Sequence, residues 1–458
     1  MRALAFATVA VLVLTPKAQA QSERLTVIVS DLHLSEASSL DALVPFLAAM
    51  AERADGAGEL VLNGDIFALG AVAEAEAGIK LESILVAQTL VLEAIASFAR
   101  ANRVVLVPGH DDAALLFPSV AARLEQRLPG VKVATRGLWI SGDARILVEH
   151  GHQLAGDPYR WERWPSDAID GKTSWGQREL DALYAKKAAE FPLVASFAGR
   201  VTGLKYALSI ERQPQISNEL LKLFLLEVSW QQFRRDLELE VEAPEWDLVA
   251  TRAAGDALLL QSIPEDDPLY DAWRDSELVA ESLTDAELRQ VCDYRAAVRR
   301  ARRRMERGLT QLARVGPVVA ECPRIESSRD PSFSYFWSAR DARYQDRLAS
   351  FAVSPDFYIH GHTHLPDRGF NVGTDQTGPH ILNAGAFRRV VTPATFEVMK
   401  EATKQSREEL LRTLRPDELP ECYSFVVIEP YEDEPRPGQW YWTRGDDGSW
   451  ETARRCEF

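Results

Sequence analysis

Residues 102–112 read NRVVLVPGHDD, an apolar run that stops at a proline and a glycine and then presents a histidine and two aspartates. A run that is apolar throughout is typical of a strand buried on both faces of a sheet. The carboxyl edge of such strands is where open α/β sheets bind ligands. The segment therefore predicts a buried strand that delivers His110, Asp111 and Asp112 to a functional edge.

Five further apolar runs end in polar residues in the same way. They are RLTVIVSD (24–31), ELVLNGD (59–65), ARILVEHGH (144–152), DFYIHGHTH (356–364) and HILNAGAF (380–387). Two stretches between the early runs, 40–54 and 81–102, have apolar residues at three- and four-residue spacing, which predicts helices. The alternation of strands and helices predicts an α/β fold.

Composition divides the 458 residues into five parts. Strand signals disappear between about 155 and 348, where tryptophans and long charged helical stretches replace them, and they resume near residue 354. We predict a core in two halves (21–155 and 346–430), separated by a large, mainly helical insertion over 156–345 that serves as a cap, substrate or interaction region. Residues 1–20 read as a signal peptide and 431–458 as a C-terminal tail with a hairpin.

The first twenty residues have the pattern of a secretory leader. An arginine precedes a short apolar stretch, and Ala18-Gln19-Ala20 has the small-x-small pattern at which leaders are cleaved. The stretch is too short for a comfortable membrane span, and no other apolar run is long enough for one. An uncleaved anchor is the alternative. We expect an exported protein, periplasmic or extracellular, with no transmembrane segment after signal cleavage.

Charge and cysteine content bound the partners and the compartment. The net charge of −16 argues against nucleic acid, because phosphate backbones bind basic surfaces. The arginine-rich segment 294–308 is either a solvated helix face or a contact with phosphate or anionic lipid headgroups. Four cysteines permit two disulfides in an exported chain, and the most local pairing is Cys292–Cys322 with Cys422–Cys456.

Seven of the eight histidines follow predicted strands, in company with four aspartates. In DLH (31–33) and HTH (362–364), an extended strand end would place both ligand side chains on one side. Gly64 allows a sharp turn before Asp65. Imidazole and carboxylate together favour Zn, Mn or Fe over Ca or Mg. Because there are more ligands than one ion needs, the pattern predicts two neighbouring ions, which can clamp the oxygens of a phosphoryl group.

The motifs DLH, NGD, PGHDD, HGH and GHTH, in that order, resemble the motif series of the calcineurin-like metallophosphoesterases. The resemblance covers residues 25–155 and 350–430. The stretches SDLHL, NGDIF and HGHTHLP are also similar to the bacterial subgroup that contains UDP-diacylglucosamine pyrophosphohydrolase. It implies a four-layer α/β/β/α sandwich and two Mn, Fe or Zn ions. It also implies hydrolysis of a phosphate monoester, diester or pyrophosphate by a metal-bridging hydroxide. The substrate would be a phosphorylated small molecule or a lipid-like molecule.

The resemblance also implies roles for individual residues. The first metal would be held by Asp31, His33, Asp65 and His364. Asp65 would bridge to the second metal, whose other ligands would be His150, His362 and the residue at the family's asparagine position. Three histidines outside that pattern would surround the site or lie on its rim: His152, which would contact substrate, His360 and His380. Two further candidates for binding substrate phosphate are Arg388 and Arg389.

The PGHDD motif departs from the family, which has Gly-Asn-His followed by Asp or Glu. If Gly109 is the family's glycine, His110 replaces the asparagine as a metal ligand, and Asp111 stands where the family's general-acid histidine stands. If His110 is that histidine, it donates the proton, and Asp111 orients its imidazole. We favour the first register because it needs no gap. The departure motivates an alternative function, a metal-binding pseudoenzyme or low-activity homologue that acts as an interaction module.

Overall fold

Two mixed sheets form the centre of the fold. The computed structural model describes residues 24–38, 40–154, 161, 163–174, 177–208, 210, 344–345, 347–371, 378–445 and 447–455. The first sheet has the order β12-β11-β10-β1-β2-β3-β4, with β1 (Leu25–Val29), β2 (Gly58–Asn63), β3 (Arg103–Val107), β4 (Val131–Val133), β10 (Cys422–Ile428), β11 (Pro437–Arg444) and β12 (Trp450–Ala453). The second has the order β5-β6-β7-β9-β8, with β5 (Leu138–Ile140), β6 (Ile146–Glu149), β7 (Phe357–His360), β8 (Asp367–Asn371) and β9 (His380–Asn383).

Parallel pairing brings the carboxyl ends of the central strands to one edge of each sheet. β1 to β4 pair in parallel in the first sheet, and β6, β7 and β9 pair in parallel in the second. The two sheets pack face to face through a shared apolar core, in which Ile28 and Val61 of the first sheet join Val148 and Ile359 of the second. The loops after β1, β2, β3, β6 and β7 therefore meet where the sheets meet.

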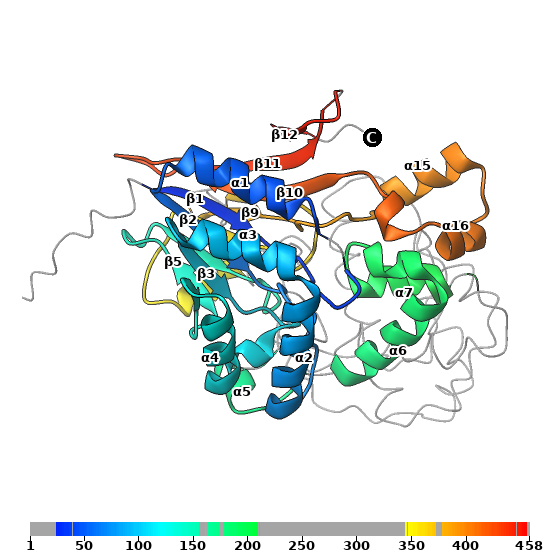
Figure 1. Ribbon diagram of the computed structural model, residues 1–458, viewed down its shortest axis with the longest axis horizontal. Helices are drawn as coiled ribbons and strands as arrows, with labels where there is room; N and C mark the ends of the chain where they lie inside the picture. Colours follow the sequence, from blue (N-terminus) through cyan, green and yellow to red (C-terminus); the bar gives the residue numbers. More distant parts are fainter. Residues whose placement is uncertain are drawn as a thin grey trace, which may run out of the picture.

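The described residues also form helices, of which α1 to α4 pack on the outer face of the first sheet. The helices are α1 (Leu43–Ala54), α2 (Glu74–Ala87), α3 (Thr89–Ala99), α4 (Pro118–Arg127), α5 (Ser166–Ile169), α6 (Gln177–Glu190), α7 (Arg200–Leu208), α15 (Pro393–Thr403) and α16 (Arg407–Thr413), with 3-10 turns η1 (Ala113–Leu116), η2 (Pro192–Ser196) and η4 (Pro416–Glu418). Figure 1 shows α1 and α3 lying across the first sheet. In α1, Leu43, Phe46, Leu47 and Met50 form one buried stripe against that sheet, as their spacing predicts.

The outer face of the second sheet is covered by residues that immediately precede β7. Tyr344 and Leu348, from helical residues 344–345 and 347–349, pack against Tyr358 of β7 and Ile381 of β9. The layers are therefore helix, sheet, sheet and helix. The predicted four-layer α/β/β/α sandwich is confirmed.

The predicted single helical stretch 81–102 is two helices, which meet at Gln88 with a bend of 89° between α2 and α3. The buried Gln88 amide donates to the carbonyl oxygens of Ser35 and Ser38, at 2.6 and 2.7 Å, and so fixes the break against the loop after β1. Among the described residues, no single helix is long and apolar enough to cross a membrane, and α2 with α3 meets that criterion only as this bent pair.

Another apolar cluster joins α6, η2 and α7 to α15 and α16. Figure 1 shows these four helices on the same side of the molecule. Phe191 and Phe197, on either side of η2, and Tyr206 of α7 pack against Phe396 of α15 and Leu410 of α16. Most of the predicted insertion, 156–345, lies outside the described residues, as do the predicted leader 1–20 and the arginine-rich segment 294–308. The helical character of the whole insertion stays a prediction.

The C-terminal residues extend the first sheet. β11 and β12 pair antiparallel, with Arg444 opposite Trp450, and β11 pairs with β10, which lies beside β1. Cys422, at the start of β10, is disulfide-bonded, and its partner lies outside the described residues, so the predicted pairing stays a prediction.

Candidate metal centre

The seven predicted metal ligands meet where the two sheets meet. They follow five parallel strands: Asp31 and His33 after β1, Asp65 after β2, His110 after β3, His150 after β6, and His362 and His364 after β7. His33 has 12% of its side chain exposed, and the other six residues are buried. Their ligand atoms form two groups in which all atoms lie within 4.8 Å of one another: a four-residue group (Asp65, His110, His150 and His362) and a three-residue group (Asp31, His33 and His364).

Five of these seven residues have left-handed backbone conformations. The φ angles are 56° for Asp31, 48° for His33, 52° for Asp65, 68° for His362 and 57° for His364. The predicted extended geometry of the DLH and HTH motifs is therefore wrong, because the backbone of each motif turns sharply after the strand end. Left-handed backbone at non-glycine residues is costly, and it persists where surrounding structure holds it, commonly at functional sites.

In the four-residue group, two imidazoles converge on one carboxylate oxygen. Nδ1 of His110 and Nε2 of His150 lie 3.2 Å apart, and they lie 2.9 and 3.2 Å from Oδ2 of Asp65. The ring of His362 completes the group, with its centroid 4.9 Å from that of His110. His110 therefore lies in a group that could hold a metal ion, and the register that makes it a ligand stays a prediction.

The three-residue group has the same arrangement. Nε2 of His33 and Nε2 of His364 lie 3.1 Å apart, and the latter lies 3.1 Å from Oδ1 of Asp31. The two groups are neighbours, because Oδ2 of Asp65 is also 3.8 Å from Nε2 of His33. Asp65 is thus the residue that joins the two groups.

The donor set fits transition-metal ions. Nitrogen and oxygen ligands at about 2.0–2.2 Å from one ion lie about 3 to 3.5 Å apart, which matches the separations in both groups. Oδ1 of Asp31 and Oδ2 of Asp65 are fully buried and accept no hydrogen bond from any residue that the structure describes. Buried carboxylate oxygens without a donor are rare and need a cause. A shared cation would satisfy these oxygens and the facing imidazole nitrogens together.

The pKa values of the site residues also indicate a place for cations. Burial alone would raise the pKa of Asp65, but His110 and His150 hold it well below its usual value. Burial would also raise the pKa of Asp31, and His150 and His364 bring it down to about 2. Conversely, burial lowers the pKa of His150, but Asp65 and Asp31 raise it to about 10. The site therefore concentrates negative charge that protons or metal cations can neutralise.

Asp112, for which the motifs predicted no specific role, holds the loops after β2 and β3 together. Its buried carboxylate accepts the backbone N–H of Gly109 at 2.6 Å and that of Ile66 at 2.7 Å. Gly109 allows this approach, because a Cβ there would lie 2.3 Å from Oδ1 of Asp65. Glycine in the PGHDD motif is therefore required by close packing against the residue that joins the two groups.

Asp111 does not have the properties of a general acid. Burial would raise its pKa, but the guanidinium of Arg200 and a hydrogen bond with His33 lower it well below its usual value. One of its oxygens, Oδ2, pairs with Arg200 and lies 3.1 Å from Nδ1 of His33. These contacts favour an ionised carboxylate over a proton donor, and the catalytic role of Asp111 stays a prediction. Because Asp111 is an ionised carboxylate, it turns Nε2 of His33 toward the metal centre.

His152 lies beside the four-residue group but not in it. Its ring centroid is 6.0 Å from that of His110, and it packs edge-on against Trp161 and Trp164 at 5.5 and 4.3 Å. Burial, followed by the nearby His150 and His110, lowers its pKa well below the usual value, so it is neutral. Its predicted contact with substrate stays a prediction.

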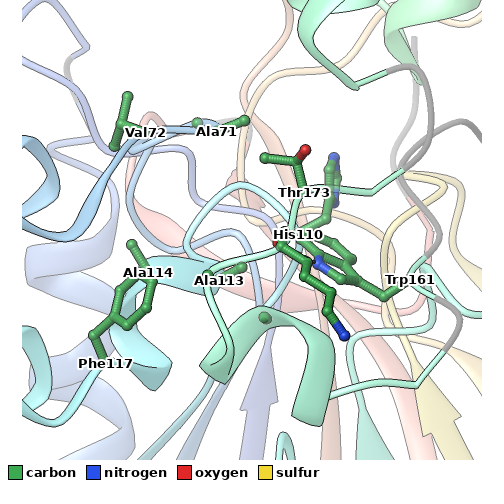
Figure 2. A pocket seen from close by; sticks show the side chains of 12 residues that line it. Ala71, Val72, His110, Ala113, Ala114, Phe117, Trp161 and Thr173 are labelled. Carbon is green, nitrogen blue, oxygen red and sulfur yellow. Dashed lines mark hydrogen bonds between the residues drawn. The ribbon is translucent and has the colours of Figure 1, made fainter.

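A small pocket of about 40 Å³ opens beside His110. Figure 2 shows His110 with Trp161 and Thr173, and with the apolar side chains of Ala114 and Phe117, around this pocket. Only one predicted ligand lines it, so the pocket is adjacent to the metal centre and does not contain it.

The four other predicted residues divide into two near the site and two away from it. Arg388 follows β9, donates to the carbonyl of Ala195, and is close enough to Asp31 and Asp111 to interact with their charges. His360, at the end of β7, lies 2.8 Å from the hydroxyl of Tyr344 and is buried behind the site.

Two predictions of position were wrong. The guanidinium of Arg389 points away from the site to Glu421, at 2.7 Å, and to backbone carbonyls before β10. His380 begins β9, opposite Phe357 at the start of β7, so it lies at the other end of the strands from the metal centre and bonds to Asn371 instead. Adjacent residues in a sequence, such as Arg388 and Arg389, need not share a direction.

Comparisons with known proteins add little to this geometry. No protein-family model matches the chain, and no curated protein matches it either. Among solved structures, the chain is similar to a dimetal phosphatase from Danio rerio, with 10% sequence identity, a TM-score of 0.29, and coverage of 91% of this chain and 95% of that chain. Because both values are low, the function proposed below rests on the side chains of the site and not on this likeness.

Proposed function

We propose that this chain is a dinuclear-metal phosphoesterase, which hydrolyses a phosphate monoester, diester or pyrophosphate. The observation that carries the proposal is the pair of imidazole–carboxylate groups joined at Asp65, whose Oδ2 lies 2.9 Å from His110 and 3.8 Å from His33. Two adjacent sites built in this way suit in-line displacement at phosphorus, where attacking and leaving oxygens both need stabilisation.

Each group would hold one ion, Mn, Fe or Zn, and Asp65 would contact both. When bound, such a pair supplies Lewis acidity toward phosphoryl oxygens and lowers the pKa of water. The protein's contribution is to keep the ligands in place. Asp111 orients His33, and the carbonyl of Asn63, 3.4 Å from Nδ1 of His150, turns Nε2 of that ring inward.

Arg388 is the residue that we assign to the substrate's phosphate. Arg388→Ala should raise the KM for an aryl phosphate by about 10- to 100-fold, because a hydrogen bond to a charged group contributes about 1.5–3 kcal/mol. The matched control is Arg389→Ala, whose guanidinium binds Glu421 away from the site. Steady-state kinetics of both variants test the assignment, and equal KM values for Arg388→Ala and the wild type would contradict it.

The finer parts of the proposal concern compartment and substrate. The leader pattern of residues 1–20 supports export to the periplasm or the outside of the cell. A phosphorylated small molecule or a lipid-like molecule remains the substrate class that we propose, with peripheral membrane contact in the second case. N-terminal sequencing of the exported protein tests the first point, with Gln21 as the expected first residue.

The ionised state of Asp111 favours one alternative, a metal-binding protein with little or no hydrolytic activity. An enzyme without a general acid depends on the stability of its leaving group. We therefore compare p-nitrophenyl phosphate with phenyl phosphate, in the presence of Mn, Zn, Co or Fe. Hydrolysis that is much faster for the nitrophenyl ester supports the enzyme with an ionised Asp111. Bound metal without hydrolysis of either ester, or of bis-p-nitrophenyl phosphate, supports the alternative.

A further inference from the structure

Arg200 connects the helices of the predicted insertion to the metal centre. It is the first residue of α7, and its guanidinium pairs with Asp111 through Nη2 and with Asp181 of α6 through Nη1, at 2.5 Å for the latter. The guanidinium also lies over the ring of Tyr184, at 5.0 Å from its centroid. Arg200 is 20% exposed and Asp111 is fully buried, so the pair is largely removed from water.

The same carboxylate oxygen that binds Arg200 also binds a predicted metal ligand. Oδ2 of Asp111 lies 3.1 Å from Nδ1 of His33, and Nε2 of that ring faces His364 at 3.1 Å. A carboxylate on Nδ1 fixes the tautomer and the orientation of a ligating histidine. The position of Asp111 therefore affects the three-residue group directly, and Arg200 fixes the position of Asp111.

The segment that carries Arg200 is attached to the core at a second point. Ala198 donates its N–H to the carbonyl of Val391 at 2.9 Å, and Val391 donates to Ser196 at 2.7 Å. Arg388 donates to the carbonyl of Ala195 in the same turn. The described residues 177–208, which we call the α6–α7 segment, therefore contact the site-forming loop after β9 as well as the loop after β3.

We propose that Arg200 is a positioning residue that couples docking of the α6–α7 segment to metal binding in the three-residue group. When Arg200 pairs with Asp111, His33 is held in the ligating orientation. By linkage, a metal ion held by His33 stabilises the docked segment to the same extent that docking strengthens metal binding. The inference rests on the proposed metal centre, but it does not require hydrolysis.

The first experiment measures metal affinity. Calorimetric titration of the metal-free protein with Zn²⁺ or Mn²⁺ should show two sites in the wild type. Arg200→Met should weaken one of them by about 10- to 100-fold, the usual effect of losing a group that orients a metal ligand, and leave the other within about threefold. Arg200→Lys keeps the charge but not the two-pronged contact. Its affinity for the weakened site should lie between those of the wild type and Arg200→Met.

Arg412→Met is the matched control. Arg412 binds Glu190 at the end of α6 and lies over Phe191, so it belongs to the same helical cluster but makes none of the contacts at Asp111. Both metal affinities should be unchanged in this variant. If Arg200→Met and Arg412→Met behave alike, Arg200 has only a structural role in the helical cluster and the proposal is overturned.

A double-mutant cycle tests the route through Asp111. Asp111→Asn alone should weaken the same site as Arg200→Met. The double variant should bind metal at that site no more weakly than Asp111→Asn alone, because both changes break the same series of contacts. Fully additive losses would show that Arg200 acts by another route and would overturn the proposal.

Hydrogen exchange of the wild type tests the coupling without any variant. Amide protection of residues 200–208 should rise when Zn²⁺ or Mn²⁺ is added, and this rise should be lost in Arg200→Met. Unchanged protection in a wild type that has bound its metals overturns the coupling. A wild type that binds no metal contradicts the metal centre itself. Metal binding with the predicted protection but without hydrolysis contradicts only the proposed phosphoesterase activity.

Discussion

Replacing Asp65 with asparagine should lower hydrolysis of p-nitrophenyl phosphate by about 1,000-fold or more, the size of loss that follows removal of a principal charge-stabilising group. Oδ2 of Asp65 lies within 3.8 Å of imidazoles from both groups, so its charge serves both proposed ions. Asparagine keeps the shape and tolerates the left-handed φ of 52°, and only the negative charge is removed. Turnover and bound metal, measured on the same samples, should fall together.

Asp55→Asn is the control for this variant. Asp55 is also an aspartate with a left-handed backbone, at φ 46°, but it is exposed at the end of α1. Its change to asparagine should leave both turnover and metal content unaltered. A correctly folded Asp65→Asn protein with wild-type turnover would contradict the proposal that the charge of Asp65 serves both ions.

Gly361→Ala should both destabilise the protein and weaken metal binding. A Cβ at this position would lie 1.9 Å from Oγ of Ser30 and 2.5 Å from Oδ2 of Asp31, and both residues are completely buried. The strand end must then shift, and it carries His362, whose N–H donates to Asp31 at 3.0 Å. Overpacking of this kind costs about 1–3 kcal/mol, and the shift also separates ligands of the two groups.

The control for Gly361→Ala is a glycine with room for a methyl group. At Gly78 in α2, the nearest atom to an added Cβ belongs to Arg123 at 3.5 Å, which is ordinary contact. Gly78→Ala should stabilise the protein by about 0.5–1 kcal/mol, since alanine is the better helix former. Chemical denaturation and calorimetric metal titration of both variants give the comparison. Wild-type stability and metal affinity in Gly361→Ala would contradict the close packing at the site.

Sequence patterns predicted the strands that carry the ligands, because each is a buried parallel strand whose polar end interrupts an apolar run. They did not reveal β10, although it lies beside β1 at the centre of the first sheet. Nothing local in CYSFVVI distinguishes a partner of β1, whose pairing joins Thr26 with Ile428 across nearly the whole chain. Pairing between distant strands is a property of the fold and not of either segment.

The site was predictable in its ligands but not in its supporting contacts. The register of the PGHDD motif favoured a ligand position for His110 and left the proton-donor position open. Arg200 could not be found in this way, because its partner Asp111 is 89 positions away in sequence and α7 carries no motif. The left-handed turns at Asp31 and His33 were also missed, since local preference favours extended backbone after a strand and only the packed site holds the turn.

Metal content of the purified protein tests the central claim most directly. After loading with Mn²⁺ or Zn²⁺ and removal of free metal, elemental analysis of the wild type should give about two ions per chain. His110→Ala should give about one, because Nδ1 of His110 lies in the four-residue group, 2.9 Å from Asp65. A wild type without bound metal would contradict the metal centre, and two ions in a His110→Ala protein that has lost turnover would make His110 a proton donor instead.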